Sequence, residues 1–127
     1  MNIYGIGTDI VSVKRIKKSL KNKNFIKRIF NKREILKCNK LSTYYNCYAK
    51  RFAAKEAFSK ALGTGISNGI NFNEIIILNS KSGKPYINLS GQTKLLIDKR
   101  LKRKKAKISL SLSDETNYAV AFVTISV

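Results

Sequence analysis

The residues best suited to chemistry are two acids, Asp9 and Glu56. The chain has 26 basic residues and only seven acidic ones, so an acid in an apolar setting is less often incidental. Glu56 has such a setting, because it lies one turn after Phe52 and one turn before Lys60 in an alanine-rich stretch. A carboxylate in a buried helix must be paired, hydrogen-bonded or bound to a metal. An i,i+4 pair with Lys60 is one interpretation of Glu56, and a metal site is the other.

Asp9 follows the apolar and small residues of IYGIGT and precedes Ile10 and Val11. Taken alone, it is interpreted as a turn or cap acid that leads into the next helix. Because the chain has no histidine, a catalytic base or a metal ligand has to be a carboxylate, a tyrosine, a lysine or water.

The length and composition predict a single domain, residues 1–127, with a hydrophobic core. The amino terminus lacks the pattern of a secretion signal, and no stretch is apolar enough to span a membrane. Cys38 and Cys47 are too few and too irregularly spaced to predict a disulfide framework or a zinc site. The cytoplasm, a reducing compartment, is therefore the predicted location.

The net charge of +19 favours an anionic partner, such as a nucleic acid, a membrane surface or an acidic protein. The chain is also rich in Asn and Ile, which together with Lys are typical of a genome with biased codon usage. We interpret part of the charge as drift on solvated faces and part as attraction to an acidic partner.

Hydrophobic periodicity predicts the elements that must position these acids in the first half of the chain. Asn31 and Glu34 form a capping box for one helix, and Gly63 and Gly65 end the long helix that carries Glu56. In order, the predicted elements are a strand over 3–10, a helix over 13–20 capped by Ser12, short helical segments around 25–29 and over 32–38, and the long helix over 42–66.

In the second half the periodicity changes from helical to extended. A helix there is predicted to turn Leu95, Leu96 and Leu101 inward, and the last strand is predicted to be buried. In order, the predicted elements are strands over 72–79 and 84–89, a helix over 91–102, and strands over 108–113 and 118–127. This order predicts an α+β fold, in which a mainly antiparallel sheet packs against a long central helix.

Four stretches of the chain together resemble the holo-acyl-carrier-protein synthase family, the short form of the 4′-phosphopantetheinyl transferases. Each piece alone is weakly specific, but four in register over nearly the whole chain are strongly specific. The stretches are GIGTDIVSVKRI (5–16), RFAAKEAFSKALGTGI (51–66), GKPY (83–86) and SLSLSDETNYAVAFV (109–123).

The resemblance implies a fold similar to that of the phosphopantetheinyl transferases and a Mg²⁺-dependent enzyme. The implied reaction moves the 4′-phosphopantetheine of coenzyme A to a serine of apo acyl carrier protein and releases adenosine 3′,5′-bisphosphate. The product would be the holo carrier protein used in fatty acid synthesis.

The resemblance also assigns the two acids. It implies that Asp9 of GTD and Glu56 of KEA bind Mg²⁺, which prefers one or two carboxylates together with phosphate oxygens. Glu56 and Lys60 are then the expected catalytic residues. Lys60 is the first candidate for contact with the coenzyme A phosphates, followed by Lys84 of GKP and by Arg51. The turn at 63–65 either brings backbone close to the nucleotide or only ends the helix.

The acceptor of the serine proton is left open by the sequence. Some family members have histidine where this chain has Asp114, so an imidazole base is excluded here. A water held by the metal, or Glu56 acting through water, is the expected acceptor. Asp114 is interpreted as a turn acid that could contribute to the site.

The resemblance further implies an acidic partner and an oligomer. A basic patch on the first helix, including Arg15, is expected to attract the acidic carrier protein. The short family form implies a homotrimer with active sites at subunit interfaces, and no membrane or nucleic-acid partner.

Two other functions compete with this interpretation. A small basic nucleic-acid-binding protein would use the lysines of 99–107 and scattered tyrosines, but no nucleic-acid-binding motif is present. A domain that keeps the fold without activity is the second alternative, and the retention of Asp9, Glu56 and Lys60 argues against it.

Overall fold

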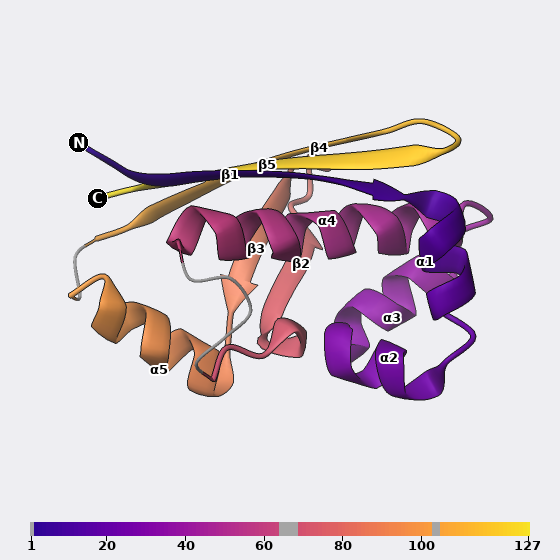
Figure 1. Cartoon of the computed structure of the whole chain (residues 1–127), viewed down its shortest axis with the longest axis horizontal. Coiled ribbons are helices and arrows are strands. Elements are labelled where there is room, and N and C mark those ends of the chain that lie inside the picture. The colour runs from indigo at the N-terminus through magenta and orange to yellow at the C-terminus, as the bar shows by residue number, and fades with distance from the viewer. Residues whose placement is uncertain (1, 64–68, 103–104) are drawn as a thin grey trace.

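A three-stranded antiparallel sheet lies on one long helix in the computed structural model (Figure 1), which describes residues 2–63, 69–102 and 105–127. The strands β1, β5 and β4 pair in that order, with the carboxyl-terminal β5 in the centre. Every pairing is antiparallel, so the predicted α+β class with a mainly antiparallel sheet is confirmed. The bounds are β1 Ile3–Ser12, β4 Lys107–Asp114, β5 Tyr118–Ser126 and the long helix α4 Tyr44–Leu62.

The remaining elements cover the side of α4 that faces away from this sheet (Figure 1). Three short helices gather at the amino-terminal end of α4, and a two-stranded sheet and α5 lie along the rest. Their bounds are α1 Val13–Ser19, α2 Lys23–Ile29, α3 Lys32–Asn39, the 3₁₀ turn η1 Phe72–Glu74, β2 Ile75–Asn79, β3 Pro85–Leu89 and α5 Gly91–Arg100. No helix in the described ranges is long and apolar enough to cross a membrane.

Local sequence signals explain where the helices begin and end. Ser12 accepts a hydrogen bond from the Arg15 amide at the start of α1, and Asn31 and Glu34 form the predicted capping box of α3. Gly63 ends α4 in the left-handed conformation, with φ of 82°, which glycine adopts without steric cost. The rest of the predicted turn, at 64 and 65, lies outside the described residues.

The contact between β1 and α4 depends on glycines in the strand. A Cβ atom on Gly7 would lie 1.8 Å from the carbonyl oxygen of Ala57, and one on Gly5 would lie 1.9 Å from that of Ala61. The backbones therefore touch where other residues would hold them apart. This close approach places the side chains of β1 directly beside those of α4.

Two burial predictions are wrong for the same kind of reason. The strand β5 is buried only on the face toward α4, and Tyr118, Val120 and Phe122 are exposed on the other face, because no described element covers that face. Of the three leucines predicted to face inward, Leu95 is exposed and Leu96 is half-buried, whereas Leu101 is buried as predicted. Both predictions judged burial from apolar character alone, and an apolar side chain does not show whether a neighbour covers it.

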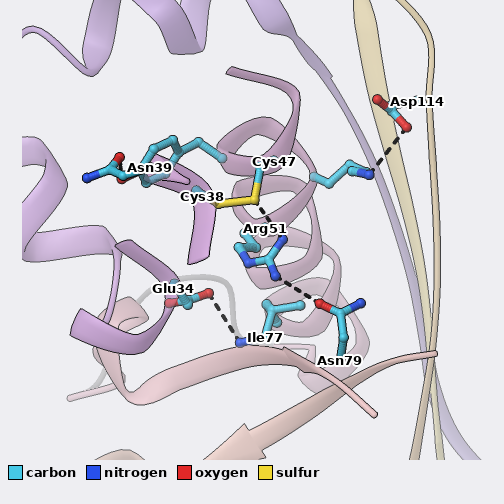
Figure 2. The surroundings of a disulfide bond; sticks show 10 residues. Glu34, Cys38, Asn39, Cys47, Arg51, Ile77, Asn79 and Asp114 are labelled. Atoms are coloured by element: carbon cyan, nitrogen blue, oxygen red, sulfur yellow. Dashed lines mark hydrogen bonds and ion pairs between the residues drawn. A yellow bond between two sulfur atoms is a disulfide. The ribbon is translucent and has the colours of Figure 1, made fainter. Parts of the chain in front are cut away.

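The two cysteines form a disulfide, contrary to the expectation from their number and spacing (Figure 2). Cys38 lies at the end of α3 and Cys47 in the first turn of α4, and their Cα atoms are 5.5 Å apart. The short turn between the helices folds α4 back alongside α3, so residues nine positions apart face each other. Sequence spacing carries no information about such a turn, which is why the pairing was missed.

Candidate active site

Asp9, Glu56 and Lys60 meet where β1 crosses the second half of α4. The Lys60 ammonium lies 3.2 Å from Asp9 Oδ1 and donates a hydrogen bond to the Thr8 carbonyl oxygen at 3.0 Å. Glu56 lies one turn earlier on the same helix, and the charge of Asp9 acts on it. The fold thus brings together the two acids that the sequence placed on different elements, and Lys60 pairs with Asp9.

Lys60 offsets only part of the negative charge of the two carboxylates. Burial raises the pKa of Glu56 above its ordinary value, the negative charge of Asp9 raises it further, and Lys60 opposes the shift. Asp9 Oδ2 is buried and has no hydrogen-bond partner. A buried acceptor without a partner and a second acid beside it leave room for one more positive charge.

The donor set fits Mg²⁺. Two carboxylates supply hard oxygen ligands, and Mg²⁺ completes its shell with water and substrate phosphate oxygens instead of a full protein cage. Across the described ranges, no group of three or more His, Cys, Asp or Glu side chains could hold a metal ion. The unpartnered oxygen of Asp9 and the raised pKa of Glu56 are therefore the features that favour a cation here.

An apolar groove of about 450 Å³ opens beside Glu56. Three phenylalanines form one side of it, with ring centroids 6.0 Å apart for Phe25 and Phe52 and 6.3 Å apart for Phe52 and Phe72. The other residues that line the groove are Arg28, Ile29, Ile70 and Asn71. Sequence reasoning missed this groove, because its walls come from α2, α4 and the segment 70–72, and no local pattern links them.

A second groove continues the first toward α1. It has a volume of about 270 Å³ and shares Phe25 and Phe52 with the larger groove. Arg15 is exposed on α1 and lines its edge, together with Ile10 and Ser19. The predicted docking residue Arg15 thus lies on a surface that is continuous with the groove at Glu56.

A family model matches most of the chain. The model of the 4′-phosphopantetheinyl transferase superfamily matches residues 5–123. The chain belongs to this superfamily.

Relatives in the superfamily extend over nearly the whole chain. The holo-acyl-carrier-protein synthase of Pelagibacter ubique (strain HTCC1062) is 50% identical over 125 residues, which cover 98% of each chain. The crystal structure of that synthase from Neisseria meningitidis is 41% identical, with a TM-score of 0.86 and coverage of 98% and 99% of the two chains. The Helicobacter pylori synthase in complex with coenzyme A is 34% identical, with a TM-score of 0.78 and coverage of 95% and 99%.

Two other residues predicted to contact coenzyme A lie apart from the Asp9–Glu56–Lys60 group within one chain. They are Arg51 and Lys84. The Arg51 guanidinium is buried, and it donates hydrogen bonds to Asn79 Oδ1 at 3.0 Å and to Cys47 Sγ at 3.2 Å (Figure 2). Lys84 is exposed after the hairpin turn between β2 and β3. Neither makes a hydrogen bond or an ion pair with the group within the described part of the chain.

Asp114 lies at the carboxyl end of β4, against the first turns of α4. Its carboxylate accepts a hydrogen bond from Asn46 Nδ2 at 2.9 Å and lies 3.4 Å from Lys50 Nζ. These contacts tie the turn between β4 and β5 to the helix. The Asp114 carboxylate therefore has partners of its own, and the structure gives it a positional role at the end of the sheet.

Proposed function

We propose that the chain transfers the 4′-phosphopantetheine of coenzyme A to a serine of apo acyl carrier protein. The observation that carries this proposal is the pair of carboxylates, Asp9 and Glu56, of which Glu56 lines an apolar groove, in a chain of this superfamily. The acids suit a cation that would bind a phosphate group, and the groove suits the long, flexible arm attached to that phosphate. The products are holo carrier protein for fatty acid synthesis and adenosine 3′,5′-bisphosphate.

Mg²⁺ is the proposed cofactor, and Asp9 and Glu56 are its proposed ligands. When bound, the cation would neutralise negative charge on the pyrophosphate of coenzyme A, as phosphoryl transfer requires. Asp9 would present its unpartnered Oδ2, and Glu56 would lose the repulsion that now raises its pKa. The chain's own contribution is to hold both oxygens in place on two packed backbones.

Lys60 is the proposed phosphate contact inside the chain. Its side chain is half exposed, so an ammonium that pairs with Asp9 can also meet a phosphate oxygen from the solvent side. Lys84 and Arg51 remain proposed contacts. The exposed Lys84 would serve a site shared with a second copy, and the buried Nε of Arg51 still lacks a partner.

Glu56, acting through water, is the proposed acceptor of the serine proton. The Glu56 carboxylate lines the groove, so a water beside it would be within reach of a serine delivered there.

An acidic carrier protein is the proposed partner, and α1 is its proposed docking helix. Arg15 lies at the edge of the groove that continues to Glu56, so a carrier bound there could deliver its serine to the acids. Lys14, Lys17 and Lys18 are exposed on the same helix and would add to the attraction.

A cytoplasmic homotrimer with sites at subunit interfaces is the proposed assembly. The outer face of the three-stranded sheet supports it, because Ile6 is 59% exposed, Ile10 64% and Phe122 45%. A contiguous apolar surface of this kind is typical of an interface between proteins. Ile10 and Val120 also line a shallow depression beside Asp114, so a neighbouring copy would lie close to that end of the sheet.

The test is a transfer reaction followed by mass spectrometry. Purified chain, apo acyl carrier protein, coenzyme A and Mg²⁺ should give a carrier that gains one phosphopantetheine, and Glu56→Ala or a chelator should abolish the gain. A folded chain that leaves a competent carrier unmodified would refute the proposal for that carrier. Salt-dependent nucleic-acid binding, unaffected by Glu56→Ala, would favour the alternative of a nucleic-acid-binding protein.

A further inference from the structure

Lys55 is a fully buried lysine whose ammonium has three acceptors. Its side chain has 0% exposure, and Nζ donates to Glu34 Oε1 at 2.6 Å, to the Ile29 carbonyl at 2.8 Å and to the Phe72 carbonyl at 2.9 Å. An ammonium has three N–H groups, so every one of them is used. No part of this side chain reaches the solvent or the acids Asp9 and Glu56.

The two carbonyl acceptors belong to two different elements that line the groove beside Glu56. Ile29 is the last residue of α2, Phe72 is the first residue of η1, and both line the groove. One ammonium therefore holds the backbone of α2 and that of η1 at a fixed separation. Because Lys55 and Glu56 are neighbours on α4, the same turn of helix places one in the core and the other at the groove rim.

Glu34 extends this connection to two further elements. Its carboxylate accepts hydrogen bonds from the Asn31 amide at 2.9 Å and from the Ile77 amide at 3.2 Å, as Figure 2 shows for Ile77. Burial lowers the pKa of Lys55 to about 8, and the charge of Glu34 opposes this shift, so the lysine is charged at neutral pH. The pair thus links α2, α3, η1 and β2 to one turn of α4.

A buried ion pair is a poor way to gain stability, because desolvation offsets most of the attraction between the charges. Apolar residues of similar size often fill such a position without loss of stability. The carbonyl oxygens of Ile29 and Phe72 better explain why a charged group is present here. Only a donor with several N–H groups can form hydrogen bonds to both oxygens at once.

We propose that Lys55 is a positioning residue that sets the width of the groove for the pantetheine arm of coenzyme A. This inference rests on the proposed function, because it takes the arm as the occupant of the groove. Lys55 does not touch the substrate in this role; it acts through the backbone of Ile29 and Phe72.

The experiment compares the binding of two ligands by calorimetry. Coenzyme A carries the arm, whereas adenosine 3′,5′-bisphosphate shares its nucleotide and lacks the arm. Lys55→Met should weaken coenzyme A binding by about tenfold and leave the binding of adenosine 3′,5′-bisphosphate unchanged. A residue that only stabilises the fold would not separate the two ligands.

Two further variants keep the test decisive. The double variant Glu34→Gln/Lys55→Met removes both charges and should fold even if Lys55→Met alone does not, because no buried charge is left unpaired; it should show the same selective loss. Lys94→Met is the matched control, because it makes the same substitution in an exposed lysine–aspartate pair on α5, and Lys94 does not line the groove. It should bind both ligands as the wild type does.

The outcomes separate this inference from the proposed function. Unchanged coenzyme A binding in the double variant, or equal weakening of both ligands, would overturn the role of Lys55. A wild type that transfers nothing to the carrier would overturn the proposed function, yet the binding comparison would still decide the role of Lys55. A wild type that does not bind coenzyme A would overturn both.

Discussion

At the scale of single residues, the site keeps two acids close together at a cost to the fold. The neighbouring negative charge of Asp9 and partial burial both disfavour the ionised form of Glu56, so its pKa is raised. Such a penalty is typical of functional sites, where residues are arranged for a ligand and not for stability. A neutral side chain in place of Glu56 should therefore remove this penalty.

Glu56→Gln should abolish transfer and, in a Mg²⁺-free buffer, raise the melting temperature by about 1–3 °C. The raised pKa means that the folded state holds the Glu56 proton after the unfolded state has released it. Stability of the wild type therefore falls as the pH rises from the ordinary carboxyl pKa to the raised one, and the deficit persists above that window. The amide does not titrate, so it escapes this loss.

Thermal unfolding of both proteins across this pH range is the measurement. The two should melt alike at the acidic end and diverge as the pH rises. A variant less stable than the wild type near neutral pH would show that Glu56 has a favourable partner, and the account of the two repelling acids would be wrong.

The residue types of the site could be predicted from the sequence, but its surroundings could not. Asp9, Glu56 and Lys60 are in motifs that can be recognised locally, and the structure brings them together. The buried positions of Arg51 and Lys55 had no such signal, because charged residues on a helix are usually solvated. Apart from Cys47, their partners lie 17 to 28 positions away, beyond any local pattern.

At the scale of elements, the contact between β1 and α4 determines the distance between Asp9 and Glu56. Gly7→Ala should cost at least about 3 kcal/mol, because the new methyl group would meet backbone atoms of Ala57 and Ala61, which cannot turn aside. The rate of phosphopantetheine transfer should fall together with the stability, because α4 has to move away from β1 and Glu56 then moves away from Asp9.

Gly83→Ala is the matched control for this prediction. Gly83 has a φ of 90° in the hairpin turn and no neighbouring atom near a Cβ, so alanine should cost about 1 kcal/mol of backbone strain. Denaturant unfolding of both variants separates crowding from backbone conformation. Equal losses would show that the close approach of strand and helix does not limit stability.

The disulfide between α3 and α4 gives a second prediction at this scale. The cross-link closes a short loop of nine positions, which should contribute about 2–3 kcal/mol by restricting the unfolded chain. Reduction should therefore lower the melting temperature by about 6–12 °C. Cys38→Ala/Cys47→Ala should melt near the reduced wild type and should not respond to reductant.

Scanning calorimetry with and without a phosphine reductant is the measurement, with a thiol count to verify reduction. A wild type that melts at the same temperature in both states would show that the ion pair between Lys55 and Glu34 already fixes α3 to α4.

The elements themselves were largely predictable, since caps, glycines and periodicity indicate their ends. What the sequence could not show is which faces are covered. The alternation in β4 and β5 is the same whether one neighbour or two pack on the sheet, so the exposure of Phe122 had to come from the structure.

At the scale of the whole molecule, the charge of +19 should act on the encounter with an acidic carrier. Arg15→Glu should raise KM for the carrier protein by about tenfold and leave KM for coenzyme A unchanged, because the reversal changes steering and docking only. Raising the salt concentration from about 50 to about 500 mM should slow the wild type toward the variant.

Steady-state kinetics with each substrate varied in turn is the measurement. Lys99→Glu is the control, since it makes the same change of charge on α5, at the other end of the molecule from α1 (Figure 1). If both reversals raise KM for the carrier equally, the net charge alone attracts the partner, and α1 is not its docking site.

The exposed apolar face of the three-stranded sheet would make the number of complete active sites depend on the concentration of the chain. In the proposed trimer, complete sites form as a power of chain concentration, so below the dissociation constant halving the amount of chain removes more than half of the sites. Specific activity should then fall on dilution and recover on concentration. A cell would control such an enzyme more steeply through its expression level than it could control a monomer.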